Sequence, residues 1–107
     1  MSIYVITGIA VVDGEVHHSV VAKVTKDPKT GVVGADIGRQ VDRAELATLM
    51  DRDEVYTVQW DGPGTFTAGS RVRPKPGPMA FPMSVDEDGT PNGDLMNVAR
   101  FNVGLDD

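Results

Sequence analysis

One segment of this chain carries the signals of an α-helix, and it constrains the fold more than any other feature. Asp42 stands where a helix N-cap belongs, and Glu45 three residues later completes an acidic form of the capping box. The apolar stripe that follows at helical spacing consists of Leu46, Leu49 and Met50. The sequence therefore predicts a helix over residues 42–51. Such a helix must lie on an apolar surface, which the rest of the chain has to supply.

The N-terminal segment predicts a β-hairpin that would form part of this surface. Asp13 and Gly14 make the dipeptide that two-residue turns favour, between apolar segments at residues 3–12 and 15–24. Regular alternation across this turn places most of the apolar side chains on the face that begins with Ile3. We expect this face to line the core.

The second half of the chain predicts further strands. Residues 54–60 alternate cleanly between apolar and polar positions, and residues 65–73 and 79–83 are the next candidates. The face of the first of these strands that we expect to meet the helix carries Tyr56, Val58 and Trp60. The predicted fold class is α+β, with a single domain over residues 1–107. An antiparallel β-meander of about five or six strands would carry the one helix packed on one face.

Composition excludes several classes of chemistry. The chain has 107 residues and no cysteine, so disulfides, thiolate metal sites and cysteine nucleophiles are absent. The net charge of −6 argues against a general affinity for DNA, RNA or anionic membranes. No apolar run approaches the roughly 20 residues of a membrane span, and no basic secretion signal precedes the first strand. We therefore expect a cytoplasmic protein.

Two groups of potential metal ligands do not fit a metal site. His17 and His18 are adjacent in a predicted strand, so their side chains point to opposite faces and cannot chelate one ion. Asp86 and Asp88 begin an acidic turn, but the residues that follow do not match the calcium loop of an EF-hand. We expect no metal site and no cofactor, with weak calcium binding at the acidic turn as the alternative.

No catalytic motif is recognisable in the sequence. The nucleophile elbow, the dinucleotide-binding glycine pattern and the phosphate-binding loop are all absent, and Ser70 has no candidate histidine partner. We therefore expect a protein that is not an enzyme. Catalysis by dispersed carboxylates, which no sequence motif would reveal, stays the alternative.

Aromatic and basic side chains concentrate in the second half of the chain and indicate binding. Residues 62–80 contain three basic side chains and no acidic one. The candidate binding residues are Trp60, Phe66, Arg71, Arg73, Lys75 and Phe81. We expect a small intracellular binding module that recognises a protein, a peptide or a second copy of itself. The alternative is weak binding of single-stranded nucleic acid or another anion through Arg71, Arg73 and Lys75.

The order of these features also resembles a known family. A strand "YVITGI" precedes a hairpin strand "HHSVVAKV", a helix entered through "VDRAEL", a strand "EVYTVQ" and a closing segment "DEDGTPNGDLMNV". This resembles a family of short bacterial domains of unknown function that share a capped helix before a "vYvv" strand and a closing "DGT…NL" segment. The chain departs from that pattern in its longer "TKDPKTGVVGADIGRQ" segment and its proline-rich arm. The resemblance implies one domain over nearly the whole chain and assigns no activity or site.

Overall fold

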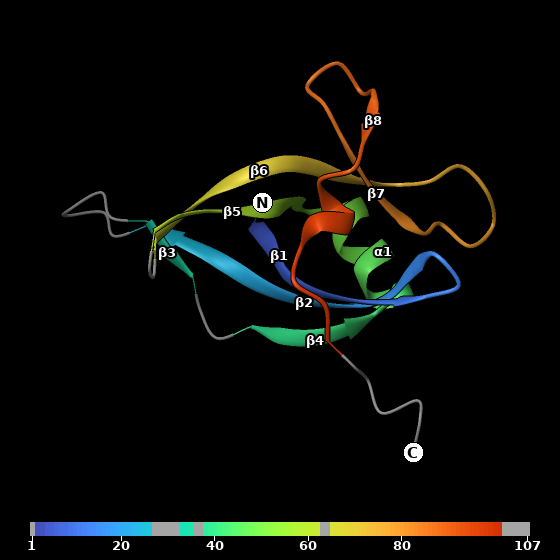
Figure 1. Cartoon of the computed structure of the whole chain (residues 1–107), viewed down its shortest axis with the longest axis horizontal. Coiled ribbons are helices and arrows are strands. Elements are labelled where there is room, and N and C mark those ends of the chain that lie inside the picture. Colours follow the sequence, from blue (N-terminus) through green and yellow to red (C-terminus); the bar gives the residue numbers. More distant parts are fainter. Residues whose placement is uncertain (1, 27–32, 36–37, 63–64, 102–107) are drawn as a thin grey trace.

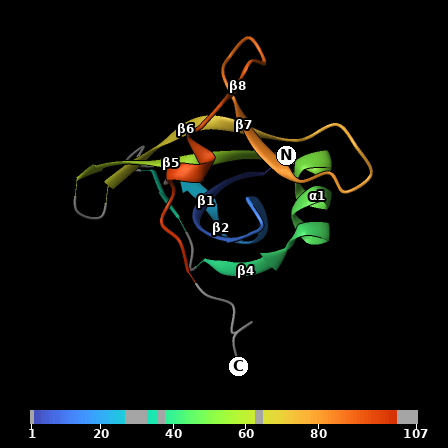
Figure 2. The ribbon, with the colours of Figure 1, turned by 45° about the vertical axis from the view of Figure 1, so that its right-hand side comes forward.

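The N-terminal hairpin lies within the sheet and has other strands on both of its sides (Figures 1 and 2). Strands β1 (Ile3–Val12) and β2 (Glu15–Lys26) pair antiparallel across a turn in which Asp13 and Gly14 have positive φ angles of 53° and 79°. Positive φ angles at both central residues are typical of a two-residue Asp-Gly turn, so the predicted hairpin is confirmed. The computed structural model describes residues 2–26, 33–35, 38–62 and 65–101.

Six further strands and one α-helix follow the hairpin in the described residues. Their bounds are β3 (Val33–Ala35), β4 (Arg39–Asp42), α1 (Arg43–Arg52), β5 (Glu54–Gly62), β6 (Thr65–Pro74), β7 (Pro82–Val85), β8 (Pro91–Asn92) and the 3-10 helix η1 (Leu95–Asn97). The sheet has the order β3-β2-β1-β5-β6-β7-β8, and β4 pairs with another part of β2. Helix α1 contacts β2, β4, β5, β6 and β7. The fold is therefore α+β, and no described helix has the length and apolar character of a membrane span.

The sheet differs from the expected meander in two respects. It has eight strands in the described part of the chain, because β4 and β8 arise from segments that show no strand pattern in the sequence. In addition, β5 runs parallel to β1, from Ile3 beside Glu54 to Ile6 beside Thr57. The helix carries the chain from one edge of β2 to the far side of β1, and such a crossover makes the next strand parallel. The prediction of a smaller, purely antiparallel meander was wrong on both points.

Two β-bulges change which side chains of the hairpin point toward the core. The predicted register holds at the start of β1, where Tyr4 lies opposite Lys23. Thr7 is then an extra residue in β1, and His17 is an extra residue in β2. Because a slip of one residue exchanges the two faces of a strand, the core receives side chains that regular alternation assigns to different faces. These side chains are Ile6, Ile9, Val16 and Val21.

Helix α1 begins as the sequence predicts. The Asp42 carboxylate accepts a hydrogen bond from the Glu45 backbone N–H at 2.8 Å, and the Glu45 carboxylate accepts one from the Asp42 N–H at 3.5 Å. Both bonds of the capping box are thus present. Leu46 and Met50 are buried and Leu49 is partly buried, so the apolar stripe faces the core.

The side of β5 that meets the core is opposite to the predicted one. Val55 and Thr57 are 0% and 3% exposed, whereas Trp60 is 59% exposed. Val55 belongs to the same buried cluster as Leu46 of the helix and Val72 of β6. The predicted alternation of β5 is correct, but the face that was expected to meet the helix is the one that points away from the core. With this orientation the polar groups of Tyr56 and Trp60 stay within reach of water, whereas the opposite orientation would bury them.

The last described segment returns to the hairpin. Leu95 of η1 and Val98 are buried in the main core. The Ile9 N–H donates to the Ala99 carbonyl at 2.9 Å, and the Phe101 N–H donates to the Ile9 carbonyl at 2.9 Å. This segment therefore pairs with β1 beyond the point where β5 leaves it, and no strand of the described residues pairs with β5 on that side after Thr57.

Candidate protein-binding surface

Strands β5 and β6 extend beyond their neighbours as a two-stranded ribbon (Figure 2). Among the described residues, β1 pairs with β5 as far as Thr57, and β7 pairs with β6 from Arg71 onward. We call the part beyond these points, residues 58–62 and 65–69, the ribbon. Because two strands alone have no core of their own, apolar side chains on the ribbon stay accessible.

One face of the ribbon is apolar. Trp60 lies opposite Phe66 in the register, and Val58 lies opposite Ala68, so the four side chains share a face. The rings of Trp60 and Phe66 meet edge to face with their centroids 6.1 Å apart. Trp60 is still 59% exposed, and it is the sole tryptophan of the chain. We call Val58, Trp60, Phe66 and Ala68 the apolar patch.

The outer edge of β6 is an open strand edge. Between residues 65 and 69, no described strand pairs with it on the side away from β5. Residues 62–70 also carry no charged side chain, although soluble proteins usually protect their edges with charges, prolines or short strands. Two other edges have such protection, since β4 carries Arg39 and Asp42 and β8 has 2 residues. The β6 edge is therefore suited to pairing with an added strand.

A β-bulge separates the ribbon from the body of the sheet. Gly69 and Ser70 together lie opposite Thr57, whose hydroxyl oxygen accepts a hydrogen bond from the Ser70 N–H at 3.0 Å. A Cβ atom on Gly69 would lie 2.5 Å from Thr57 Oγ1 and 3.3 Å from the Thr57 carbonyl oxygen. The close approach of the two strands at this point thus requires glycine.

A polar network holds an acidic turn against the end of the open edge. The Asn92 side-chain amide donates to the Ser70 hydroxyl at 3.1 Å and to the Asp86 carboxylate at 2.8 Å. The Ser70 hydroxyl donates in turn to the Asp94 carboxylate. We call residues 86–94 the acidic turn. Its exposed carboxylates are those of Asp86, Glu87, Asp88 and Asp94.

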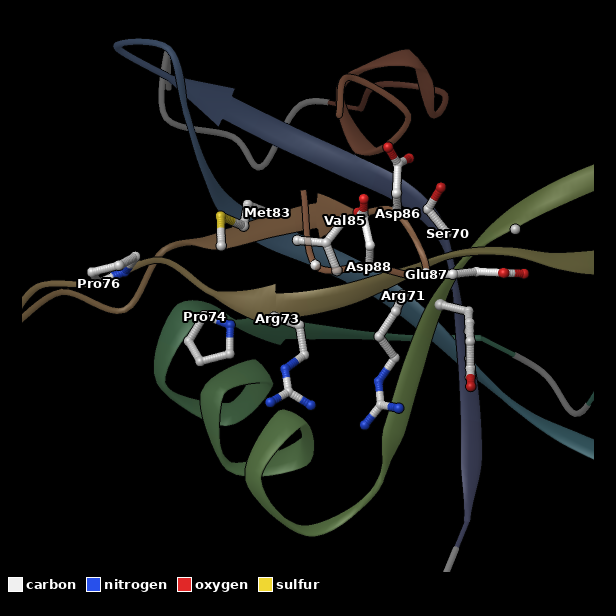
Figure 3. A pocket seen from close by; sticks show the side chains of 13 residues that line it. Ser70, Arg71, Arg73, Pro74, Pro76, Met83, Val85, Asp86, Glu87 and Asp88 are labelled. Atoms are coloured by element: carbon white, nitrogen blue, oxygen red, sulfur yellow. The ribbon is translucent and has the colours of Figure 1, made fainter. Parts of the chain in front are cut away.

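A groove lies on the outer face of β6 and β7 (Figure 3). It has a volume of about 1160 Å³. Arg71 and Arg73 lie side by side in it and point away from Asp86. Val85 and Met83 are their register partners on β7 and share their face. The structure thus brings Arg71 and Arg73 together, as their alternate positions in the sequence predict.

The basic side chains do not form a continuous cationic surface. Arg71 Nη1 lies 3.4 Å from Glu54 Oε1, and Lys75 Nζ lies 2.6 Å from Glu15 Oε1. Arg73 alone of the three has no ion pair with another described residue. The acidic turn also lines the same groove. Two of the three charges are therefore neutralised, which leaves little field to attract a nucleic acid.

Phe81 and Lys75 belong to a different part of the molecule from Trp60. The centroid of the Phe81 ring is 5.2 Å from the centroid of the His17 ring and 5.6 Å from the guanidinium carbon of Arg43. The Lys75 N–H donates to the Phe81 carbonyl at 2.7 Å. The proline-rich loop between β6 and β7 therefore folds back onto β2 and α1, and the structure does not gather the six candidate binding residues into one site.

Tyr56 gives a titration test of the geometry in the groove. Its hydroxyl donates to Glu54 Oε1 at 2.6 Å. This hydrogen bond, followed by burial and by the charge of Glu54, raises the pKa of Tyr56 above its ordinary value of 10.0, while Arg71 opposes the shift. Because the folded protein favours the neutral phenol, the resulting stabilisation is present below pH 10.0 and is lost as the pH rises through the raised pKa.

We expect the tyrosinate absorbance of the wild-type protein, minus that of Tyr56→Phe, to titrate above pH 10.0. Glu54→Gln removes the charged acceptor and should move this midpoint downward. A midpoint at or below the ordinary value in the wild-type protein would contradict the Tyr56–Glu54 contact.

A backbone hydrogen bond within the acidic turn stabilises one of its carboxylates. The Thr90 N–H donates to the Asp88 carboxylate at 2.9 Å, and this bond lowers the pKa of Asp88 below its ordinary value. Within the described part of the chain, no group of three or more histidine, aspartate and glutamate side chains could hold a metal ion. The weak candidates Asp86 and Asp88 therefore lack a third described ligand of this kind.

The sequence pointed to Trp60 and Phe66 as candidate binding residues. It did not reveal the open edge of β6, which extends from the ribbon to the acidic turn. The signal for the edge was present, since residues 62–70 are uncharged. The contact of Ser70 with Asn92 had no signal, because it joins residues far apart in the sequence. No protein-family model, curated protein or solved structure matches this chain.

Proposed function

We propose that this protein is an interaction module that binds an extended segment of a partner protein along the ribbon. The observation that carries the proposal is Trp60, which is 59% exposed over Phe66 beside an uncharged open strand edge. Tryptophan is among the residues that contribute most to the binding energy of protein interfaces, because covering its large ring removes much apolar surface from water.

The size of the apolar patch supports an extended partner over a globular one. Fully burying an aromatic side chain removes roughly 150–250 Å² from water. A standard interface buries about 800 Å² on each partner, so the patch alone is too small for a stable contact between two globular surfaces. An added strand gains main-chain hydrogen bonds from β6 and places alternate side chains on the patch. Strand addition therefore uses both features of the ribbon.

Site-specific photo-crosslinking in living cells tests this proposal. Phe66→p-benzoylphenylalanine keeps an aromatic ring in the apolar patch and should give discrete crosslinked products after irradiation. The matched control carries the same group in place of Thr48, which is exposed on helix α1. We expect no such products from the control, and we expect Trp60→Ser to remove those formed at Phe66. Products that are the same from both positions, or no products at all, would contradict the proposal.

A further inference from the structure

We infer that the bound segment runs antiparallel to β6 and carries basic side chains at its N-terminal end. This inference rests on the proposed function and specifies the chemistry and direction of its partner. It follows from three features of the described residues: the direction of β6, the position of the acidic turn, and the absence of charged residues from position 65 to position 70 of β6.

The open edge has one closed end. Strand β6 runs from the tip of the ribbon toward Arg71, where β7 takes over the pairing at Val85. An added strand must therefore stop near Ser70, which the network through Asn92 connects to Asp86. One end of the added strand lies at the acidic turn, and its other end lies at the tip of the ribbon.

The two ends of the edge differ strongly in charge. The ribbon has one charged residue, Asp61, and residues 62–70 have none, whereas the acidic turn holds four exposed carboxylates. Hydrogen bonds from Ser70 and Asn92 fix two of these carboxylates, those of Asp94 and Asp86, at the closed end. Basic side chains on a partner are complementary to this end, and uncharged side chains suit the rest of the edge.

The direction of the added strand then decides which of its ends is basic. Both existing neighbours of β6, the strands β5 and β7, are antiparallel to it. Antiparallel pairing is also slightly more stable per residue than parallel pairing. An antiparallel segment begins at the acidic turn and ends at the tip of the ribbon. The basic side chains are therefore at its N-terminal end.

A second copy of this chain fits the edge less well than a basic segment. Antiparallel self-pairing would bring the uncharged start of the partner's β6 to the acidic turn, where no basic side chain would meet the carboxylates. Each copy also carries a net charge of −6, which opposes their approach. Electrostatic complementarity thus favours a different, basic partner.

Two synthetic octapeptides test the inference directly. One has the sequence Lys-Lys-Thr-Val-Thr-Val-Thr-Val, and the other has the two lysines at the C-terminal end; both are blocked at their termini. The readouts are the amide resonances of residues 66–69 and the fluorescence of Trp60. We expect the first peptide to bind at least about threefold more tightly at low salt, with a smaller ratio at high salt because salt screens exposed charges.

Two variants with the same charge change locate the effect. Glu87→Gln removes one carboxylate of the acidic turn and should reduce the preference for the first peptide about twofold. Thr48→Lys adds one positive charge on the exposed side of helix α1 and should leave the preference unchanged. Equal effects of the two variants would contradict the role of the acidic turn.

The outcomes separate this inference from the proposed function. Equal binding of both peptides, with changes at residues 66–69, overturns the inference and leaves the strand-binding function standing. A dimer in light scattering, with the amides of residues 66–69 already protected before any peptide is added, overturns the inference in favour of a second copy. If neither peptide affects these amides and no crosslink forms at Phe66, both the inference and the function fail.

Discussion

Replacing Gly69 by alanine is expected to lower the free energy of unfolding by about 2 to 3 kcal/mol. The new Cβ would lie 2.5 Å from Thr57 Oγ1, and Thr57 is only 3% exposed. Its hydroxyl cannot move away freely, because it accepts the hydrogen bond from the Ser70 N–H that forms the bulge. For a domain of this size the melting temperature should fall by on the order of 10 °C. Thermal unfolding followed by circular dichroism measures this change.

The matched control for this substitution is Gly93→Ala. A Cβ on Gly93 would meet no atom within 4 Å, so its effect should stay within about 0.5 kcal/mol. Equal melting temperatures for the two variants would contradict the close approach of β5 and β6. Because the bulge forms the base of the ribbon, Gly69→Ala should also weaken peptide binding at temperatures where the variant is still folded.

Replacing Ser84 by alanine is expected to cost about 2 kcal/mol, although the change removes a single oxygen atom. The Ser84 hydroxyl is 1% exposed in a part of the sheet where it connects two backbone groups. It accepts a hydrogen bond from the Leu95 N–H at 2.9 Å and donates to the Asn92 carbonyl at 3.0 Å. Alanine would leave the buried Leu95 N–H without its partner. Chemical denaturation with urea measures the loss.

Ser19 provides the opposite case and the control. It is also 1% exposed, but its hydroxyl has no hydrogen-bond partner among the described residues. Ser19→Ala should therefore be neutral or stabilising by up to about 1 kcal/mol, because it removes an unsatisfied buried group. If both substitutions destabilise the protein equally, the hydrogen bonds assigned to Ser84 do not contribute as described.

The sequence predicted those parts of the fold that local signals determine. The capping box at Asp42 and Glu45 and the turn at Asp13 and Gly14 are both present. These features depend on residues within a few positions of one another, so their chemistry can be recognised without knowledge of the tertiary structure.

The parts that were missed depend on contacts between distant segments. No local signal marks Thr7 and His17 as extra residues, so regular alternation assigned Ile6 and Val21 to the face away from the core, although both are buried in it. The phase of β5 was wrong for a related reason. The face with Trp60 was placed against the helix, whereas β5 meets the helix through Val55.

The candidate surface was predicted in part. The sequence identified the aromatic residues Trp60 and Phe66, but it could not show that β1 and β7 stop short of them. The basic residues at 71–75 were visible as well, but their neutralisation by Glu54 and Glu15 depends on the tertiary structure. Residue type therefore predicted which side chains could bind, and the fold decided which of them are accessible together.

Fluorine NMR of protein that contains fluorotryptophan tests the central claim most directly. Trp60 is the sole tryptophan, so a single resonance reports on the apolar patch. The resonance of the purified protein should show the large solvent-isotope shift of an exposed ring, and it should move or broaden in a lysate of the cells that produce the protein. Ala68→Lys, which places a charge in the apolar patch, should abolish the change in the lysate. A ring without a solvent-isotope shift, or a resonance that the lysate leaves unchanged, would contradict the assignment of the ribbon as the binding surface.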